Sequence, residues 1–225
     1  LDFFVLYKPK LFSRPLDFGT LLKVKLKNKY ISTLVGLVLK SIYNIVFPQF
    51  SQNVDTDIEI KQTSRFPDDI DKVCNAYNKT FRNMVARSVR YLNWRYNDRP
   101  DKSYKIYIAY KDGEPLGYCV YGHTERDGIK IGLIMDIYAV HKNDVVLKVL
   151  ACHVLNEMDK EGKALASCLL QPNSPILKVL KKCGFVFPLT RFGPYILRLN
   201  SDNLKLAAIN KLDDWHITFG DADFI

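Results

Sequence analysis

Apolar and polar positions follow the most regular pattern between residues 132 and 185. An apolar run at residues 133–140 is typical of a buried strand. After a polar break, apolar residues recur at three- and four-residue steps and predict a helix: Val145, Val146, Val149, Leu150, Val154, Leu155 and Met158. Residues 163–171 predict a second strand, and residues 174–182 predict a second helix that ends at a glycine. The order strand, helix, strand, helix predicts a βαβα unit.

The place where this unit would bind a ligand follows from its topology. Parallel sheets bind ligands beyond the carboxyl ends of their strands, close to the N-terminus of the next helix. The first strand ends near Tyr138 and the next helix begins near Val145. We therefore expect the functional site around residues 138–145.

Upstream of this unit, the pattern predicts a strand, two helical segments and a hairpin. Residues 57–63 alternate like a strand, and a Pro-Asp-Asp sequence then opens a helix. The apolar face of that helix carries Val73, Cys74, Tyr77 and Phe81. Residues 89–96 form a further helical or loop segment, and two strands flank the turn at residues 111–115. Downstream, residues 191–199 predict a strand and residues 203–212 a short helix.

The first fifty residues have a different pattern. Residues 2–7 are rich in strand-forming side chains, and a lysine cluster follows at Lys23, Lys25, Lys27 and Lys29. The cluster leads into residues 31–47, where only Lys40 is charged. One interpretation is a membrane span or an interfacial anchor with a basic flank. Interspersed small and polar residues favour the other interpretation, in which a helix packs between two parts of a larger protein.

A polar linker at residues 50–56 suggests a domain boundary. We expect residues 1–50 to be the terminal strand and linker helix of a preceding lobe that lies N-terminal to this chain. Residues 51–225 would then form one domain, which is a common domain size.

Composition narrows the class of protein. The net charge of +9 favours anionic partners, but zinc-finger spacing and an aromatic RNA-binding signature are both missing, so we expect no nucleic-acid partner. The five cysteines are odd in number and none forms a CxxC pair, which argues against disulfides and against a structural zinc site. Together with the lack of a signal peptide, this predicts a cytoplasmic protein with reduced core thiols.

Several side chains are candidates for chemistry. Asp136 interrupts the apolar strand, where burial would raise its pKa towards the range of a general base. The alternative is a structural carboxylate paired with Arg95. His123, at the end of a hairpin strand, is a second candidate base, and Tyr138 would line the pocket or pack in the core.

A second group of residues would contact the substrate. Trp94, Arg95 and Tyr96 combine flat rings with a forked donor, which suits a planar or anionic group, and Trp215 would line the same site. The alternative is a packed helix end. The nearby pair Asp221 and Asp223 lacks further ligands, so we expect no metal site.

Three stretches resemble the GNAT (Gcn5-related N-acetyltransferase) superfamily, which has a mixed α/β fold. Residues 110–118 are similar to its DG-x-x-x-G hairpin, residues 134–158 to its cofactor strand and helix, and residues 173–185 to its closing N…K-x-x-G-F motif. The resemblance covers residues 57–225 and implies an N-acyltransferase that moves an acyl group from acetyl-CoA, or another acyl-CoA, to a small-molecule amine. It also implies a set of cofactor-binding residues: Ile137, Tyr138, Ala139, Lys142, Asn143 and Asn173.

The chain departs from this family at two positions. The loop at residues 141–144 has none of the glycines with which the family wraps a diphosphate. Leu180 stands where the resemblance places a tyrosine acid. The alternative function is therefore a catalytically degenerate GNAT-like module that binds a small ligand or a protein.

Overall fold

The computed structural model describes most of the chain. The described residues are 3–7, 10–23, 26, 28–48, 57–101, 103–140, 143–191, 195–198 and 215–221. Three of the sequence predictions lie outside them: the linker at residues 50–56, cofactor contacts by Lys142, and the helix at residues 203–212. Asp223 also lies outside the described residues.

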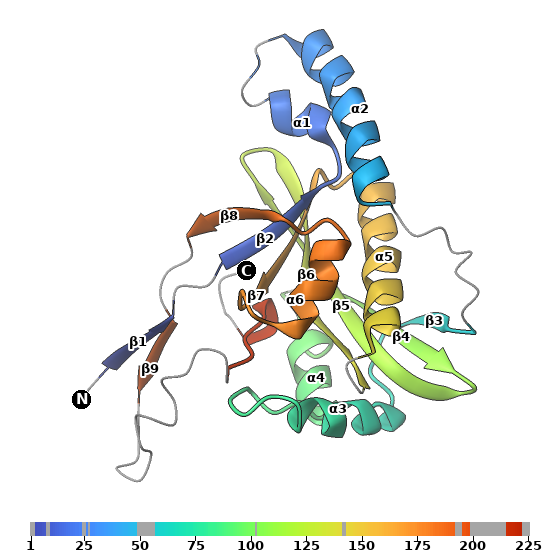
Figure 1. The fold of residues 1–225 in the computed structure, drawn as a ribbon. Coiled ribbons are helices and arrows are strands. Elements are labelled where there is room, and N and C mark those ends of the chain that lie inside the picture. The colour runs from blue at the N-terminus through green and yellow to red at the C-terminus, as the bar shows by residue number, and fades with distance from the viewer. Residues whose placement is uncertain are drawn as a thin grey trace.

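The described strands form one seven-stranded mixed sheet and one separate strand pair (Figure 1). In spatial order, the sheet contains β3 (Glu59–Thr63), β4 (Lys105–Lys111), β5 (Glu114–Arg126), β6 (Ile129–Ala139), β7 (Leu165–Leu170), β2 (Lys10–Pro15) and β8 (Phe187–Arg191). The separate pair is β1 (Phe3–Tyr7) with β9 (Tyr195–Arg198). The helices are α1 (Phe18–Lys23), α2 (Lys29–Val46), α3 (Asp71–Asn78), α4 (Val89–Tyr96), α5 (Asp144–Lys160) and α6 (Pro175–Lys182).

The predicted βαβα unit is confirmed as β6, α5, β7 and α6, with β6 and β7 parallel. Helix α6 ends as predicted, because Gly184 follows its C-cap with φ +89°, a backbone conformation that favours glycine. The whole order from β3 to α6 is the GNAT-like order that the resemblance implied. The prediction of a mixed α/β fold is therefore confirmed.

Helices α3 and α5 cover opposite faces of this sheet. Paired residues of antiparallel strands point to the same face, so Asp136 shares a face with its partner Val120, and the neighbouring residues face the other way. Tyr77 of α3 contacts the face that carries Asp136. His153 of α5 contacts the ring of Tyr107, on the opposite face. The core therefore has two layers of side chains, one on each side of the sheet.

Strand β2 is the main element that the pattern does not predict. It lies between β7 and β8 and pairs antiparallel with both. The Ser13 hydroxyl hydrogen-bonds the Ser167 hydroxyl at 2.8 Å, and the Arg14 guanidinium donates to the Cys183 carbonyl at 2.5 Å. Residues 10–15 are thus an internal strand of the same sheet as residues 57–191. The division at residue 50, with a preceding lobe, stays a prediction.

The helix predicted at residues 31–47 is α2, and the shorter helix α1 precedes it in the chain (Figure 1). Asn28 caps α2 by accepting from the backbone N–H groups of Tyr30 and Ile31. The two helices project beyond the sheet as a pair. None of the helices in the described part of the chain has the length and apolar content needed to cross a lipid bilayer.

Substituting Gly36 with alanine should loosen α1 from α2. A Cβ atom at residue 36 would collide with the backbone of Gly19, which cannot swing away as a side chain could. Overpacking of this kind costs about 1–3 kcal/mol. We expect faster amide hydrogen exchange in α1, whereas Ser41→Ala, on the exposed side of α2, should leave exchange unchanged. Unchanged exchange in Gly36→Ala would show that the two helices do not depend on this contact.

Candidate functional site

Strands β6 and β7 separate towards their carboxyl ends. They pair only from Ile131 with Leu165 to Ile134 with Cys168. Beyond that point β6 continues to residue 139 with β5 as its only strand partner among the described residues, and β7 continues beside β2. The edge of β6 at residues 135–139 that faces away from β5 therefore has no strand beside it within the described part of the chain.

A small pocket lies at this divergence. It is lined by Thr80, Phe81, Tyr138, Ala139, Asp144, Leu147, Pro175 and Ile176, so it is bounded by the end of β6 and by the N-termini of α5 and α6. Its volume is about 10 Å³, which is room for about one water molecule. The predicted site around residues 138–145 thus coincides with a pocket that side chains nearly fill.

A larger pocket of about 760 Å³ adjoins the small one. It is lined by Lys72, Asn75, Ala76, Lys79, Thr80, Glu114, Pro115, Leu116, Tyr138 and Val140. Thr80 and Tyr138 line both pockets and therefore form the wall between them. The larger pocket combines lysines with a carboxylate, which suits a polar ligand.

Tyr138 is buried at this wall. Its hydroxyl hydrogen-bonds the Thr80 hydroxyl at 2.8 Å, and its ring stacks on Tyr77 with the centroids 4.1 Å apart. Burial raises the pKa of Tyr138, so the phenol stays protonated at neutral pH. Thr80 donates its own proton to the Ala76 carbonyl at 2.9 Å, so Tyr138 donates to Thr80, and the Tyr138 oxygen can accept a hydrogen bond from a ligand.

Asp136 accepts hydrogen bonds from three side chains, and its role, catalytic or structural, stays a prediction. Arg87 Nε donates to it at 2.9 Å, and the hydroxyls of Tyr118 and Tyr77 donate at 3.2 Å. Burial raises the pKa of Asp136, and the Arg87 guanidinium beside it opposes that rise. The side chain is fully buried, so it cannot reach an amine in either pocket. The predicted partner Arg95 is wrong, because Arg87 takes that place.

Arg87 joins Asp136 to the C-terminal segment at residues 215–221. Its guanidinium donates to both carboxylate oxygens of Asp221, at 2.7 and 3.0 Å, and to the Val85 carbonyl at 2.7 Å. Asp221 ends the 3₁₀ turn η4 (Phe219–Asp221) and also accepts from the Thr218 backbone N–H. Sequence reasoning missed Arg87, because it lies in a segment without periodic apolar residues that would mark it as buried.

His216 completes this buried network. Tyr77 donates its single proton to Asp136, so His216 Nε2 donates in turn to the Tyr77 oxygen. Burial lowers the pKa of His216 to about 3, which keeps the imidazole neutral. Its Nδ1 has no hydrogen-bond partner among the described residues. The sequence gives no sign of this histidine's place in the fold.

The remaining candidate residues are not brought together. His123 is exposed on β5, opposite Gly132 and about 10 Å along the sheet from Asp136. Trp94 is 56% exposed, whereas Arg95 and Tyr96 are buried, so these three side chains do not form one surface. Trp215 forms a backbone bridge with Asn83. The catalytic and substrate-binding roles predicted for these residues stay predictions.

Two groups of polar atoms are candidates for contacts with a cofactor between β6 and β7. Asn143 caps α5 by accepting from the N–H groups of Val145 and Val146, at 3.1 and 3.2 Å. On the β7 side, the Gln171 carboxamide and the Ser174 hydroxyl are buried without hydrogen-bond partners among the described residues. Asn173, another predicted contact, lies exposed between them. Buried polar atoms without partners are rare in proteins and indicate a polar ligand or water.

The cysteines and the acidic residues do not add a site. All five cysteines are buried, and none of them forms a disulfide. Burial raises the pKa of Cys168, so that thiol is not activated as a nucleophile. Within the described ranges, no group of three or more His, Cys, Asp or Glu side chains is placed to hold a metal ion.

No protein-family model matches this chain, and no curated protein matches it. Solved structures that it resembles include a GCN5-related N-acetyltransferase from Anabaena variabilis, with TM-score 0.49 and 7% identity over 78% of this chain. A probable N-acyltransferase from Enterococcus faecalis matches with TM-score 0.46 and 13% identity over 73% of this chain. A ribosomal-protein-alanine N-acetyltransferase from Brucella melitensis matches with TM-score 0.43 and 14% identity over 63% of this chain. The matches cover 36%, 33% and 99% of those chains, respectively. The chain thus spans about a third of the first two structures.

Proposed function

We propose that this chain is an N-acyltransferase that binds an acyl-coenzyme A thioester between β6 and β7 and transfers the acyl group to an amine. One observation carries the proposal: residues 135–139 of β6 have β5 as their only strand partner among the described residues, and after β7 the polar atoms of Gln171 and Ser174 are buried without hydrogen-bond partners there. The pantetheine arm of coenzyme A is extended and contains two amides. Such a chain can pair with an open strand edge as an added strand does.

The residues present fit the pantetheine arm. The backbone of Ile137, Tyr138 and Ala139 would hold its amides from one side, and Gln171 and Ser174 would hold it from the other. The diphosphate would lie near the N-terminus of α5, where the Asn143 side chain already accepts from two of the backbone N–H groups. The bound thioester supplies an acyl carbonyl that is activated towards attack by an amine.

The side chains at the wall between the pockets position the reaction. Tyr138 stays protonated and donates to Thr80, so its oxygen would accept a hydrogen bond from the incoming amine. Because the small pocket has room for about one water molecule, side chains that line it would have to move aside for the arm to enter. The amine would occupy the larger pocket, which Lys72 and Glu114 line as an ion pair.

A second candidate function is a degenerate module that binds a ligand without catalysis. Two observations favour it: the Asp136 carboxylate is fully occupied by Arg87, Tyr77 and Tyr118, and Leu180 is fully buried where the family resemblance places a tyrosine acid. For either function we propose a cytoplasmic location, since five buried cysteines without a disulfide suit a reducing compartment.

Acetyl-coenzyme A should raise the unfolding temperature of the chain. A ligand at a hundred times its dissociation constant stabilises the folded state by about 2.7 kcal/mol. Acetyl-pantetheine should also shift the transition, because we place the binding energy on the pantetheine arm. Adenosine 3′,5′-bisphosphate, which lacks that arm, should give a much smaller shift. If no thioester shifts the transition, the proposed acyl-coenzyme A site is wrong.

Substituting Ala76 with phenylalanine should separate transfer from cofactor binding. Ala76 lines the larger pocket but not the small one, so the added ring fills only the space assigned to the amine. We expect thiol release from acetyl-coenzyme A in the presence of a panel of simple amines to fall by at least about tenfold. The thermal shift with acetyl-coenzyme A should stay. If Ala76→Phe releases thiol at the rate of the unsubstituted protein, the amine binds outside the larger pocket. If the unsubstituted protein releases no thiol with any amine, the chain is the degenerate module.

A further inference from the structure

Helix α2 turns its small and polar side chains towards the protein. Ser32 and Gly36 are buried, and Gly36 packs directly on α1. Farther along, the Tyr43 hydroxyl donates to the Gly184 carbonyl at 2.5 Å, and Lys40 pairs with Asp159 at 2.8 Å. A surface helix normally does the reverse and buries its apolar stripe.

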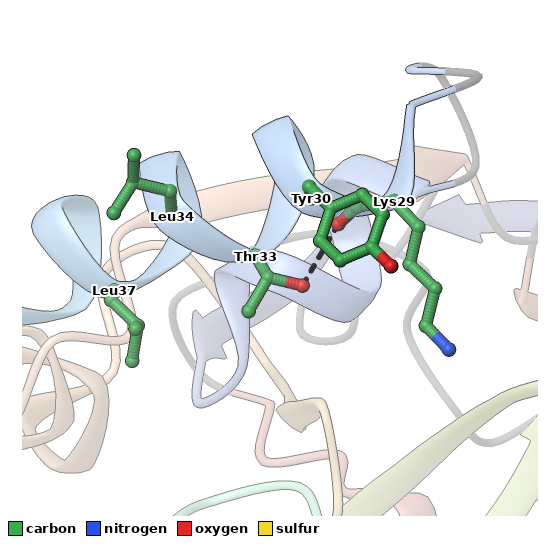
Figure 2. A pocket seen from close by; sticks show the side chains of 5 residues that line it. All are labelled: Lys29, Tyr30, Thr33, Leu34 and Leu37. Atoms are coloured by element: carbon green, nitrogen blue, oxygen red, sulfur yellow. Dashed lines mark hydrogen bonds between the residues drawn. The ribbon is translucent and has the colours of Figure 1, made fainter.

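The apolar side chains of α2 point outwards. Its exposed large hydrophobic residues are Tyr30, Ile31, Leu34, Val35, Leu37, Val38, Leu39, Ile42, Ile45 and Val46. Tyr30 is 87% exposed, Leu34 67% and Ile45 80%. Figure 2 shows part of this apolar face, with Leu34 and Leu37 standing out from the helix and the Thr33 hydroxyl donating to the Lys29 carbonyl. A continuous apolar face of this kind marks a surface that another body covers.

The charge of the same segment indicates what covers it. Residues 18–54 contain five lysines, Lys23, Lys25, Lys27, Lys29 and Lys40, and no aspartate or glutamate. Asp159 neutralises Lys40, whereas Lys23 and Lys29 are exposed at the ends of α1 and α2 that lie next to each other in the chain. An apolar helix face with a cationic end is the pattern of a helix that lies in the interface of an anionic membrane.

We propose that the α1–α2 pair docks the protein onto a membrane surface that contains anionic phospholipids, with the apolar face of α2 lying in the interface. The pair projects beyond the sheet (Figure 1), so α2 can lie on a surface without displacing any strand. A second copy of the chain fits less well, because a twofold contact would bring two acid-free, lysine-bearing segments together. The proposal does not depend on the acyltransferase activity.

Co-sedimentation of the whole chain with lipid vesicles tests the docking. We expect at least about tenfold tighter binding to vesicles of phosphatidylcholine mixed with phosphatidylglycerol than to phosphatidylcholine alone, and weaker binding as salt is added. The double substitution Leu34→Glu and Leu37→Glu should abolish binding, and the fold should survive because both side chains are exposed. Val85→Glu, at an exposed apolar residue outside α2, should bind like the unsubstituted protein.

Three outcomes would overturn the proposal. Failure to bind either kind of vesicle would show that the α1–α2 pair does not dock on a lipid membrane. Equal binding to neutral and anionic vesicles would show that the lysines do not select anionic phospholipids. The third outcome is a protein that does not bind vesicles and is a dimer by sedimentation velocity. If the double substitution Leu34→Glu and Leu37→Glu converts that dimer to a monomer, the apolar face binds a second copy of the chain instead.

Discussion

Replacing Arg87 with methionine should lower the free energy of unfolding by about 3–5 kcal/mol. The guanidinium is the cation between two carboxylates, Asp136 and Asp221, and the ionised side chains of Arg87 and Asp136 are both fully buried. Methionine has a similar length but leaves both carboxylates without their counter-ion. The loss is a large part of the stability of an ordinary domain, which is about 5–15 kcal/mol.

Urea unfolding measures this loss against a matched control. Arg65 pairs with Asp98 at 2.8 Å on the surface, so Arg65→Met should cost less than about 1 kcal/mol. Arg87→Lys keeps the charge but not the forked contact to Asp221, and it should fall between the two. A loss below about 1 kcal/mol for Arg87→Met would show that the network does not hold the fold together.

Acid should destabilise the protein through His216. Burial lowers the pKa of this imidazole to about 3 in the folded state, against about 6.5 in an unfolded chain. Between those values the unfolded state binds a proton that the folded state does not, so stability is present above pH 6.5 and is lost as the pH falls. The loss between pH 7 and pH 5 is about 2 kcal/mol from this residue alone.

The pH dependence can be assigned by substitution. His216→Gln cannot take up the proton, so the free energy of unfolding should change by about 2 kcal/mol less between pH 7 and pH 5 than in the unsubstituted protein. His123→Gln, at an exposed residue of β5, should leave the pH dependence as it is. An unchanged slope in His216→Gln would mean that the histidine is accessible to protons in the folded state.

The sequence predicts the centre of the fold because the pattern there is local. Strands β6 and β7 are short apolar runs, and α5 and α6 have helical periodicity, so burial and type follow from neighbouring residues. The burial of Asp136 was predictable in the same way, since its sequence neighbours are apolar. The position of the candidate site at the carboxyl end of β6 was predictable as well, because parallel sheets bind ligands beyond the carboxyl ends of their strands.

What the sequence does not predict depends on contacts between distant segments. Strand β2 contains Arg14 and Pro15, so its own sequence gives no clear strand pattern. It is an internal strand because β7 and β8 pair with it on either side. Asp136 could have paired with several arginines, and only the fold selects Arg87. The apolar run of α2 predicts a helix but not which of its faces is buried, because periodicity does not show which face packs against α1.

Amide hydrogen exchange with and without acetyl-coenzyme A tests the central claim most directly. We predict that the cofactor slows exchange at residues 135–139 of β6 and at residues 171–176 after β7, because these segments flank the proposed pantetheine site. Exchange in the antiparallel pair of β3 and β4, at the far edge of the sheet, should stay the same. Unchanged exchange at residues 135–139 with saturating acetyl-coenzyme A would contradict the proposal that this strand edge holds the thioester.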